Sequence, residues 1–184
     1  ELKVTANKDY TFAIADGKKL AKITYLVNDT YDISGEKGVF SPAGTNISPN
    51  NYMLNLHGFV GYFDDMMATP YELTVNHPAT LAGVTSMVDT DKSDTKDVFV
   101  AERYFEVTDN PIMYSKPDQT TFTVGGMEVV LSVYSPNGTF SAKDLTADIE
   151  KMMRAQKAFL GDINKNKRYV ILLYLSEMMK NVAQ

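Results

Sequence analysis

The chain has 184 residues, enough for one domain or for a domain with part of another, and enough to bury a hydrophobic core. It contains no cysteine, which excludes a disulfide framework and any zinc site with cysteine ligands. The formal net charge is -5 and the 18 basic residues are scattered, so nucleic acid is not an expected partner. No stretch has the length and apolar character of a transmembrane segment, and no signal peptide is recognisable. The compartment stays open, although we favour a periplasmic or secreted location.

Short alternating segments separated by turn residues occupy the chain up to about residue 135, a pattern typical of β-strands. We expect a strand at "KITYLV", residues 22–27, and a longer one at "DVFVAERYFEV", residues 97–107. One face of the longer strand would carry Phe99, Ala101, Phe105 and Val107. The fold class predicted from this pattern is mainly β: an antiparallel β-sandwich or saddle-shaped sheet, followed by a small α+β unit of strand, helix and strand.

An acidic segment and the two histidines are candidates for a metal site, but their sequence context does not match a known metal-binding motif. The segment "DTDKSDTKD", residues 89–97, is acidic, but the sixth and twelfth positions of an EF-hand loop would be Asp94 and Val100 instead of Gly and Glu. We therefore expect a solvated loop. The histidines, His57 and His77, are not in an H-E-x-x-H motif, so structural roles are expected for both.

One segment is a candidate binding site. In "VTDNPIMYSKPDQ", residues 107–119, two prolines stiffen what looks like a loop that could present Asp109, Asn110 and Tyr114 to a substrate. The alternative is a rigid turn whose residues Ile112 and Met113 lie in the core.

A hairpin is expected at "TTFTVGGMEVVLSVY", residues 120–134, because Gly125 and Gly126 tolerate the positive φ values of a two-residue turn. It predicts the strand that opens the α+β unit.

An amphipathic helix is expected from about Ala142 to Leu160, with Ser141 as its N-cap and Gly161 at its end. Its apolar positions are Leu145, Ile149, Met152, Met153, Gln156, Phe159 and Leu160. The apolar strand "RYVILLYL" follows, which predicts a βαβ unit. We expect Leu145, Ile149, Met152 and Phe159 to pack on the face of the sheet that carries Val130 and Leu172.

No local motif identifies an enzyme: the chain lacks G-x-S-x-G, a glycine-rich phosphate loop and H-E-x-x-H. A self-contained, secreted β-sandwich module that binds protein or glycan is therefore one reading. A metal-independent enzyme that uses the acidic loops is a weaker one.

A family likeness is carried, in chain order, by "NLHGFVGYFDDM", "PYELTVNHP", "FEVTDNPIMYSKPD", "VVLSVYSPNG", "MMRAQKAFLGD" and "RYVILLYL". Together they resemble the glycyl aminopeptidase family of zinc metallopeptidases, which belongs to the thermolysin-like clan and includes PDZ-containing aminopeptidases. The resemblance implies a β-rich N-terminal domain over residues 1–127 and the start of a catalytic domain over residues 128–184. It also implies that the rest of the catalytic domain and a PDZ-like domain are partners in the full-length protein.

The family's zinc ligands and general-base Glu match no position of this chain. We therefore expect no catalytic residue, no metal ligand and no cofactor here, and zinc in the full-length protein. The implied role is to help to form the peptide-substrate cleft and to support the catalytic domain, with Asp109 as a candidate partner for the substrate ammonium. We also expect the isolated chain to self-associate at the end that carries Met178, Met179 and Val182.

Overall fold

The structure is a computed structural model that describes residues 1–8, 10–31, 44–163 and 165–176. It is mainly β, with two α-helices, α1 and α2, among the described residues. The elements are β1 (Val4–Ala6), β2 (Phe12–Ile14), η1 (Gly17–Lys19), β3 (Asn46–Ser48), β4 (Asn51–Leu54), η3 (Leu56–Gly58), β5 (Tyr71–Asn76), β6 (Ala82–Val84), β7 (Lys96–Ala101), α1 (Tyr104–Thr108), β8 (Ile112–Ser115), β9 (Gln119–Val124), β10 (Met127–Tyr134), α2 (Ala142–Leu160) and β11 (Arg168–Tyr174).

Two antiparallel sheets form a β-sandwich around the main core. One has four strands in the order β3-β4-β8-β6, and the other pairs β5 with β7. Strand β5 alternates between half-buried and exposed residues, as expected for a strand with one face on a core. The buried residues between the sheets are Leu54, Leu56, Leu81, Phe99, Ala101, Val107, Ile112 and Tyr114. The prediction of an antiparallel sandwich is confirmed.

Two of the expected strands are wrong. Residues 22–27 form no strand, since no neighbouring strand in the described part of the chain pairs with this segment. Leu26 is accordingly 93% exposed. The strand expected over residues 97–107 ends at Ala101, where the helix α1 follows. The helix is set by long-range and local bonds that periodicity does not reveal: the Tyr104 N–H donates to the carbonyl of Met67, and the Glu106 carboxylate accepts from the N–H of Glu102.

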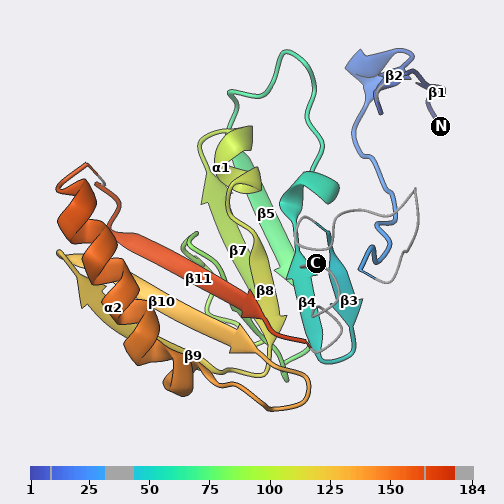
Figure 1. Ribbon diagram of the computed structural model, residues 1–184. Helices are drawn as coiled ribbons and strands as arrows, with labels where there is room; N and C mark the ends of the chain where they lie inside the picture. Colours follow the sequence, from blue (N-terminus) through green and yellow to red (C-terminus); the bar gives the residue numbers. More distant parts are fainter. Residues whose placement is uncertain (9, 32–43, 164, 177–184) are drawn as a thin grey trace.

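The α+β unit forms as predicted (Figure 1). Strands β9 and β10 are antiparallel around Gly125 and Gly126, whose φ angles are 56° and 82°, and β11 lies parallel to β10. The expected boundary between residues 127 and 128 falls inside β10, which belongs to the same sheet as β9. The division of the chain into those two domains stays a prediction.

Helix α2 begins at a capping box and covers one face of the β11-β10-β9 sheet (Figure 1). The Ser141 hydroxyl accepts from the Asp144 N–H, and the Asp144 carboxylate accepts from the Ser141 N–H. Met153 is buried, and Leu145 and Ile149 pack on the sheet as expected.

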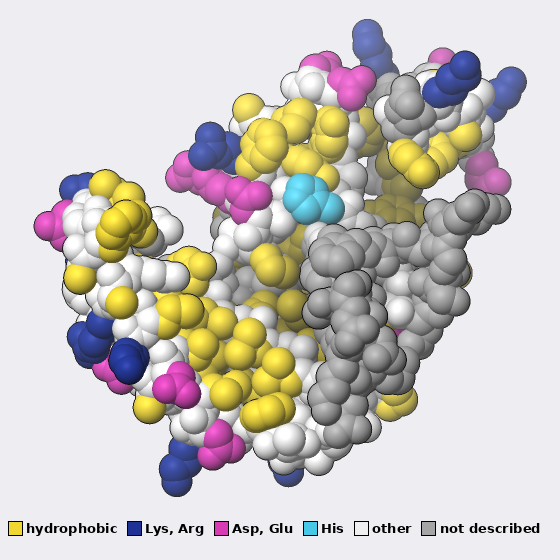
Figure 2. Space-filling model, viewed as in Figure 1, with side chains coloured by type: hydrophobic (Ala, Val, Ile, Leu, Met, Phe, Trp, Pro, Cys, Tyr) yellow, Lys and Arg dark blue, Asp and Glu magenta, His cyan; other side chains and the backbone are white. Residues whose placement is uncertain are grey.

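The facing strand residues differ from the expected ones by one position. Leu131 and Ile171, which are paired in register, contact the helix side, so Val130 and Leu172 point to the opposite face. Hydrophobic side chains remain visible on the surface beside α2 (Figure 2). Strand β11 contributes to this surface because its apolar residues from Val170 to Tyr174 are only half-buried.

Phe159 is 90% exposed, which contradicts its expected burial. Replacing Phe159 with alanine should therefore change the free energy of unfolding by less than about 0.5 kcal/mol. Met153→Ala, at a site that is 9% exposed, should cost about 2 kcal/mol or more. Urea unfolding of both variants checks this, and equal losses in the two would show that the end of α2 is packed.

No helix in the described part of the chain has the length and apolar character needed to cross a membrane. Met178, Met179 and Val182, on which the expected self-association rests, lie outside the described residues. That expectation stays a prediction.

Candidate functional site

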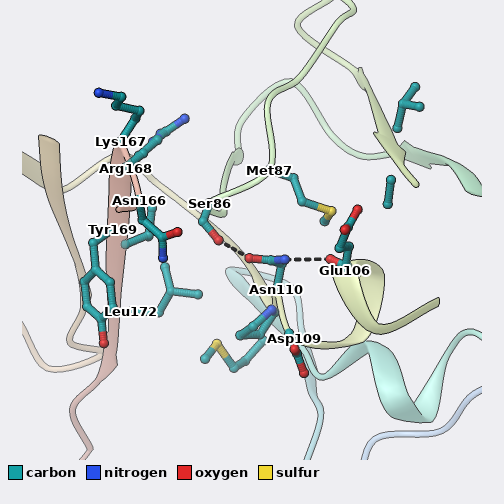
Figure 3. A pocket seen from close by; sticks show the side chains of 15 residues that line it. Ser86, Met87, Glu106, Asp109, Asn110, Asn166, Lys167, Arg168, Tyr169 and Leu172 are labelled. Carbon is teal, nitrogen blue, oxygen red and sulfur yellow. Dashed lines mark hydrogen bonds between the residues drawn. The ribbon is translucent and has the colours of Figure 1, made fainter. Parts of the chain in front are cut away.

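A cleft of about 870 Å³ lies between the β-sandwich and the edge of the three-stranded sheet. Residues at the start of β11 line one side of it (Figure 3). Helix α1 and the turn after it line the other side, and Ser86 and Asn110 lie between the two. Both sides carry polar residues, with apolar contributions from Met53, Met87, Pro111 and Leu172.

The α1 side of the cleft is acidic. Glu106 lies in the first turn of α1 and Asp109 is the C-cap residue. The Glu106 carboxylate accepts from the N–H of Glu102 at 2.9 Å and from Arg103 Nε at 3.2 Å, which holds it in place. Asp109 is exposed and has no ion-pair partner among the residues that the structure describes. A carboxylate is thus left facing solvent at the cleft.

Asn110 fixes this acidic side to the sandwich. Its Nδ2 donates to the carbonyl of Glu106 at 2.6 Å, and its Oδ1 accepts a short hydrogen bond from the Ser86 hydroxyl. Both bonds are drawn in Figure 3. Since Ser86 follows β6, the amide joins the end of α1 to the four-stranded sheet.

The β11 side is basic. Lys167 precedes β11 and Arg168 is its first residue. Arg168 is paired in register with Glu128 of β10, and its Nε lies 3.4 Å from Glu128 Oε1. Lys167 is exposed and has no ion-pair partner within the described ranges. The cleft therefore has walls of opposite charge.

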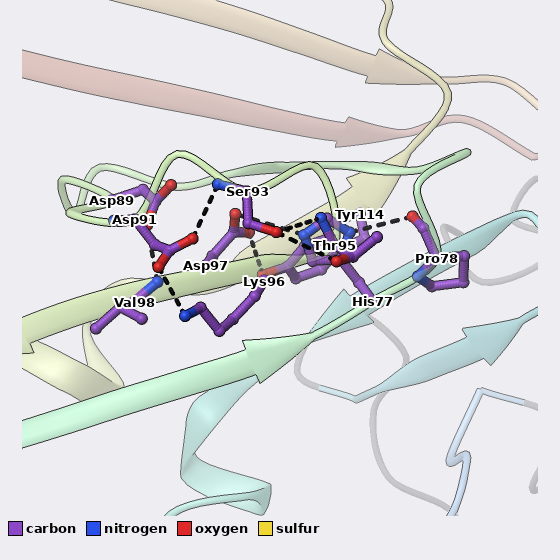
Figure 4. A network of polar contacts seen from close by, with 10 residues as sticks. All are labelled: His77, Pro78, Asp89, Asp91, Ser93, Thr95, Lys96, Asp97, Val98 and Tyr114. Carbon is purple, nitrogen blue, oxygen red and sulfur yellow. Dashed lines mark hydrogen bonds and ion pairs between the residues drawn. The ribbon is translucent and has the colours of Figure 1, made fainter.

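Tyr114 is away from the cleft, in a polar network inside the sandwich (Figure 4). Its side chain is fully buried, and its hydroxyl donates to Asp97 Oδ2 at 2.6 Å. His77 Nε2 lies 3.4 Å from the other oxygen of Asp97. The centroids of the His77 and Tyr114 rings are 4.8 Å apart. Burial, with the hydrogen bond to Asp97, raises the pKa of Tyr114 far above its usual value of 10.0.

The three predicted substrate-binding residues thus separate. Asp109 and Asn110 line the cleft, whereas Tyr114 lies in the core strand β8 with Ile112 and Met113, all of them fully buried. The alternative of a rigid segment with Ile112 and Met113 in the core is confirmed.

The sequence analysis missed five polar residues of the cleft: Ser86, Glu106, Asn166, Lys167 and Arg168. Glu106 was interpreted as part of a strand, and the other four residues are brought near α1 only by the tertiary fold. An acidic residue at the third position of a short helix was the one available local signal.

In the acidic segment at residues 89–97, Asp89 and Asp91 use their carboxylates in bonds within the segment and to the strand that follows it (Figure 4). Asp89 accepts from the N–H groups of Asp91 and Val98, and Asp91 accepts from Lys96 Nζ at 2.7 Å. The Lys96 hydrogen bond lowers the pKa of Asp91. Across the described residues, no three acidic or imidazole side chains are grouped so that they could hold a metal ion.

The sequence model of the family described as Peptidase M61 N-terminal domain matches residues 1–116. The chain belongs to this family. It is therefore a peptidase-associated N-terminal domain, and the resemblance seen in the sequence is confirmed. The acidic side of the cleft, with Glu106 and Asp109, lies within the matched M61 region, whereas the basic side lies beyond it.

Among solved structures, the M61 N-terminal chain is similar to the aminopeptidase N family protein from Idiomarina loihiensis, with a TM-score of 0.60 and 15% sequence identity. The match covers 73% of this chain and 26% of that chain, and at this identity it shows the fold alone. No curated protein matches the chain.

Proposed function

We propose that this chain is the non-catalytic N-terminal portion of a zinc-dependent aminopeptidase, and that its cleft forms one wall of the site that holds the peptide substrate. The observation that carries the proposal is the acidic side of the cleft, Glu106 and Asp109, within an M61 N-terminal domain. The family match also favours this function over a self-contained module that binds protein or glycan.

An aminopeptidase must recognise the free amino terminus of a peptide, which is a cation at neutral pH. Charge-assisted hydrogen bonds from an ammonium to carboxylates are about twice as strong as neutral ones. Asp109 offers a carboxylate that is not neutralised by a neighbouring cation among the described residues, and Glu106 is oriented by Glu102 and Arg103. Asn110 acts as a positioning residue, because its side chain bonds to the Glu106 carbonyl and to Ser86 of the sandwich.

Zinc does not fit the residues of this chain. His57 is exposed on η3, while His77 lies against Asp97 in the interior, and no suitable group of ligands exists in the described part. We assign zinc to the catalytic domain, where it would polarise the attacked carbonyl and activate water. The role of this chain is to bind and orient the amino end of the peptide.

The α+β unit supplies the second part of the role, which is support of the catalytic domain. Strand β11 is apolar on both faces, yet its residues from Val170 to Tyr174 are only half-buried. A strand of this composition is typical of sheets covered on both sides. We propose that the rest of the catalytic domain covers Ile171 and Leu173, which do not line the cleft, with a PDZ-like domain elsewhere in the full-length protein and preference for an amino-terminal glycine.

The amine-binding role can be tested on the chain itself with trialaninamide, which has a free amino end, and N-acetyl-trialaninamide, which does not. We expect the free amine to bind at least fivefold more tightly in NMR titrations, with shifts at the amides of Asp109 and Asn110. Asp109→Asn should remove most of this preference, while Asp148→Asn on the exposed side of α2 should keep it. Equal binding of the two peptides by the unmodified chain would refute the acidic wall as an amine site.

A further inference from the structure

We infer that the same cleft also binds the carboxylate end of a short peptide through Lys167 and Arg168, so that it selects zwitterionic peptides with both ends free. The inference rests on the proposed function for the amino end and adds a second recognition element on the opposite wall. The ligand class is a short, unblocked peptide whose two termini lie within one cleft.

The first observation is the charge arrangement. Glu106 and Asp109 line one side, while Lys167 and Arg168 line the other, across a volume of about 870 Å³ (Figure 3). Within the described residues, no ion pair joins the two sides: Glu106 pairs with Arg103, and Arg168 pairs with Glu128. Opposite charges that face one cleft without neutralising each other match a ligand that carries both charges.

The second observation is the state of the Arg168 side chain. Its Nε is buried and makes no hydrogen bond in the described structure, and its neighbour Glu128 Oε1 is 3.4 Å away. A guanidinium has five N–H donors in a planar fork that matches the two oxygens of a carboxylate. One contact with Glu128 leaves donors for a ligand, and Lys167, which is exposed, lines the same side of the cleft.

The third observation is that the cleft borders the edge of a sheet. Arg168, Val170 and Leu172 point to one face of β11, and Lys167 and Tyr169 to the other, yet all five line the cleft. Residues of both faces thus line the cleft beside the strand, and β11 is the edge strand of the described sheet. An extended peptide can run along such an edge and form main-chain hydrogen bonds, which leaves its two ends to the charged walls.

The test compares trialanine, which has both ends free, with trialaninamide and N-acetyl-trialanine, each with one end blocked. The 184-residue chain is titrated with each peptide, and dissociation constants come from NMR shifts at cleft residues. We expect trialanine to bind at least fivefold more tightly than either blocked peptide. Lys167→Gln should lower the affinity for trialanine to that for trialaninamide and leave trialaninamide binding unchanged, while Lys151→Gln on exposed α2 should alter neither.

The outcomes separate the two proposals. If trialanine and trialaninamide bind equally while N-acetyl-trialanine binds more weakly, the carboxylate site is wrong and the amine site stands. If trialaninamide binds more weakly than trialanine but acetylation has no effect, the basic wall binds the peptide carboxylate and the acidic wall does not bind the amino end. That result would refute selection of zwitterionic peptides. If no peptide changes the NMR signals of cleft residues, the amine site and the carboxylate site are both wrong. Because Lys167→Gln leaves the Arg168 pair with Glu128 intact, misfolding of the variant is not expected.

Discussion

Replacing Leu131 with alanine is expected to lower the free energy of unfolding by about 3–5 kcal/mol. Leu131 is completely buried in the central strand β10, where it is paired with Thr120 of β9 and Ile171 of β11. It also belongs to the cluster that joins the sheet to Ala142 at the start of α2. The truncated side chain would leave a cavity that strands bonded on both sides cannot close, because their registers are fixed.

Urea unfolding measures this effect, and Leu26→Ala is a matched control because Leu26 is 93% exposed. The control should change stability by less than about 0.5 kcal/mol. A loss below about 1 kcal/mol at Leu131 would contradict the described packing of α2 on the sheet. The result bears on function, since β11 carries the basic wall of the cleft.

Replacing Gly83 with alanine should cost about 2–3 kcal/mol, which is near the upper end for an overpacked site. An added Cβ would lie 2.6 Å from Asp97 Oδ2 and 2.7 Å and 2.9 Å from ring atoms of Tyr114. The Tyr114 ring is fully buried and its hydroxyl is bonded to Asp97, so neither neighbour can withdraw without breaking the network.

The matched control is Gly61→Ala, where an added Cβ meets nothing within 4 Å. Thermal unfolding should show a large fall in the midpoint for Gly83→Ala and little change for Gly61→Ala. Similar midpoints for both variants would mean that the tyrosine network adapts and does not constrain β6.

The elements with local chemical signals could be predicted from the sequence. Gly125 and Gly126 determine a hairpin because both adopt positive φ, and Ser141 with Asp144 caps α2. The sandwich followed from alternating strands and turn residues. These signals act over a few residues, so they are visible without knowledge of the fold.

The errors arose where distant contacts decide the local structure. Helix α1 depends on Tyr104 bonding to Met67, so alternation alone suggested a strand that continued to residue 107. The helical periodicity of α2 placed Phe159 on the apolar face and did not show that its side chain is 90% exposed.

The sequence allowed only some of the cleft residues to be predicted. Asp109 and Asn110 were found because they stand out in a segment stiffened by proline. Tyr114 was assigned to the same site, although it lies in β8, whose four residues are all buried. Glu106 is close to Asp109 in sequence but was not predicted, because residues 97–107 were assigned to a single strand. Arg168 reaches the cleft only through the parallel pairing of β11 with β10.

The most direct test of the central claim is a kinetic measurement on the full-length peptidase that contains this chain. Glu106→Gln and Asp109→Asn keep side-chain size while they remove the charge, and the amide at position 106 can still accept one of the two hydrogen bonds from Glu102 and Arg103. With an aminoacyl substrate, we predict that the double variant lowers kcat/KM by about 10–100-fold, mostly through KM, which corresponds to about 1.4–2.8 kcal/mol of lost binding. Asp148→Asn should have no effect, and the melting temperatures of all variants should agree. An unchanged kcat/KM in a folded double variant would contradict the account.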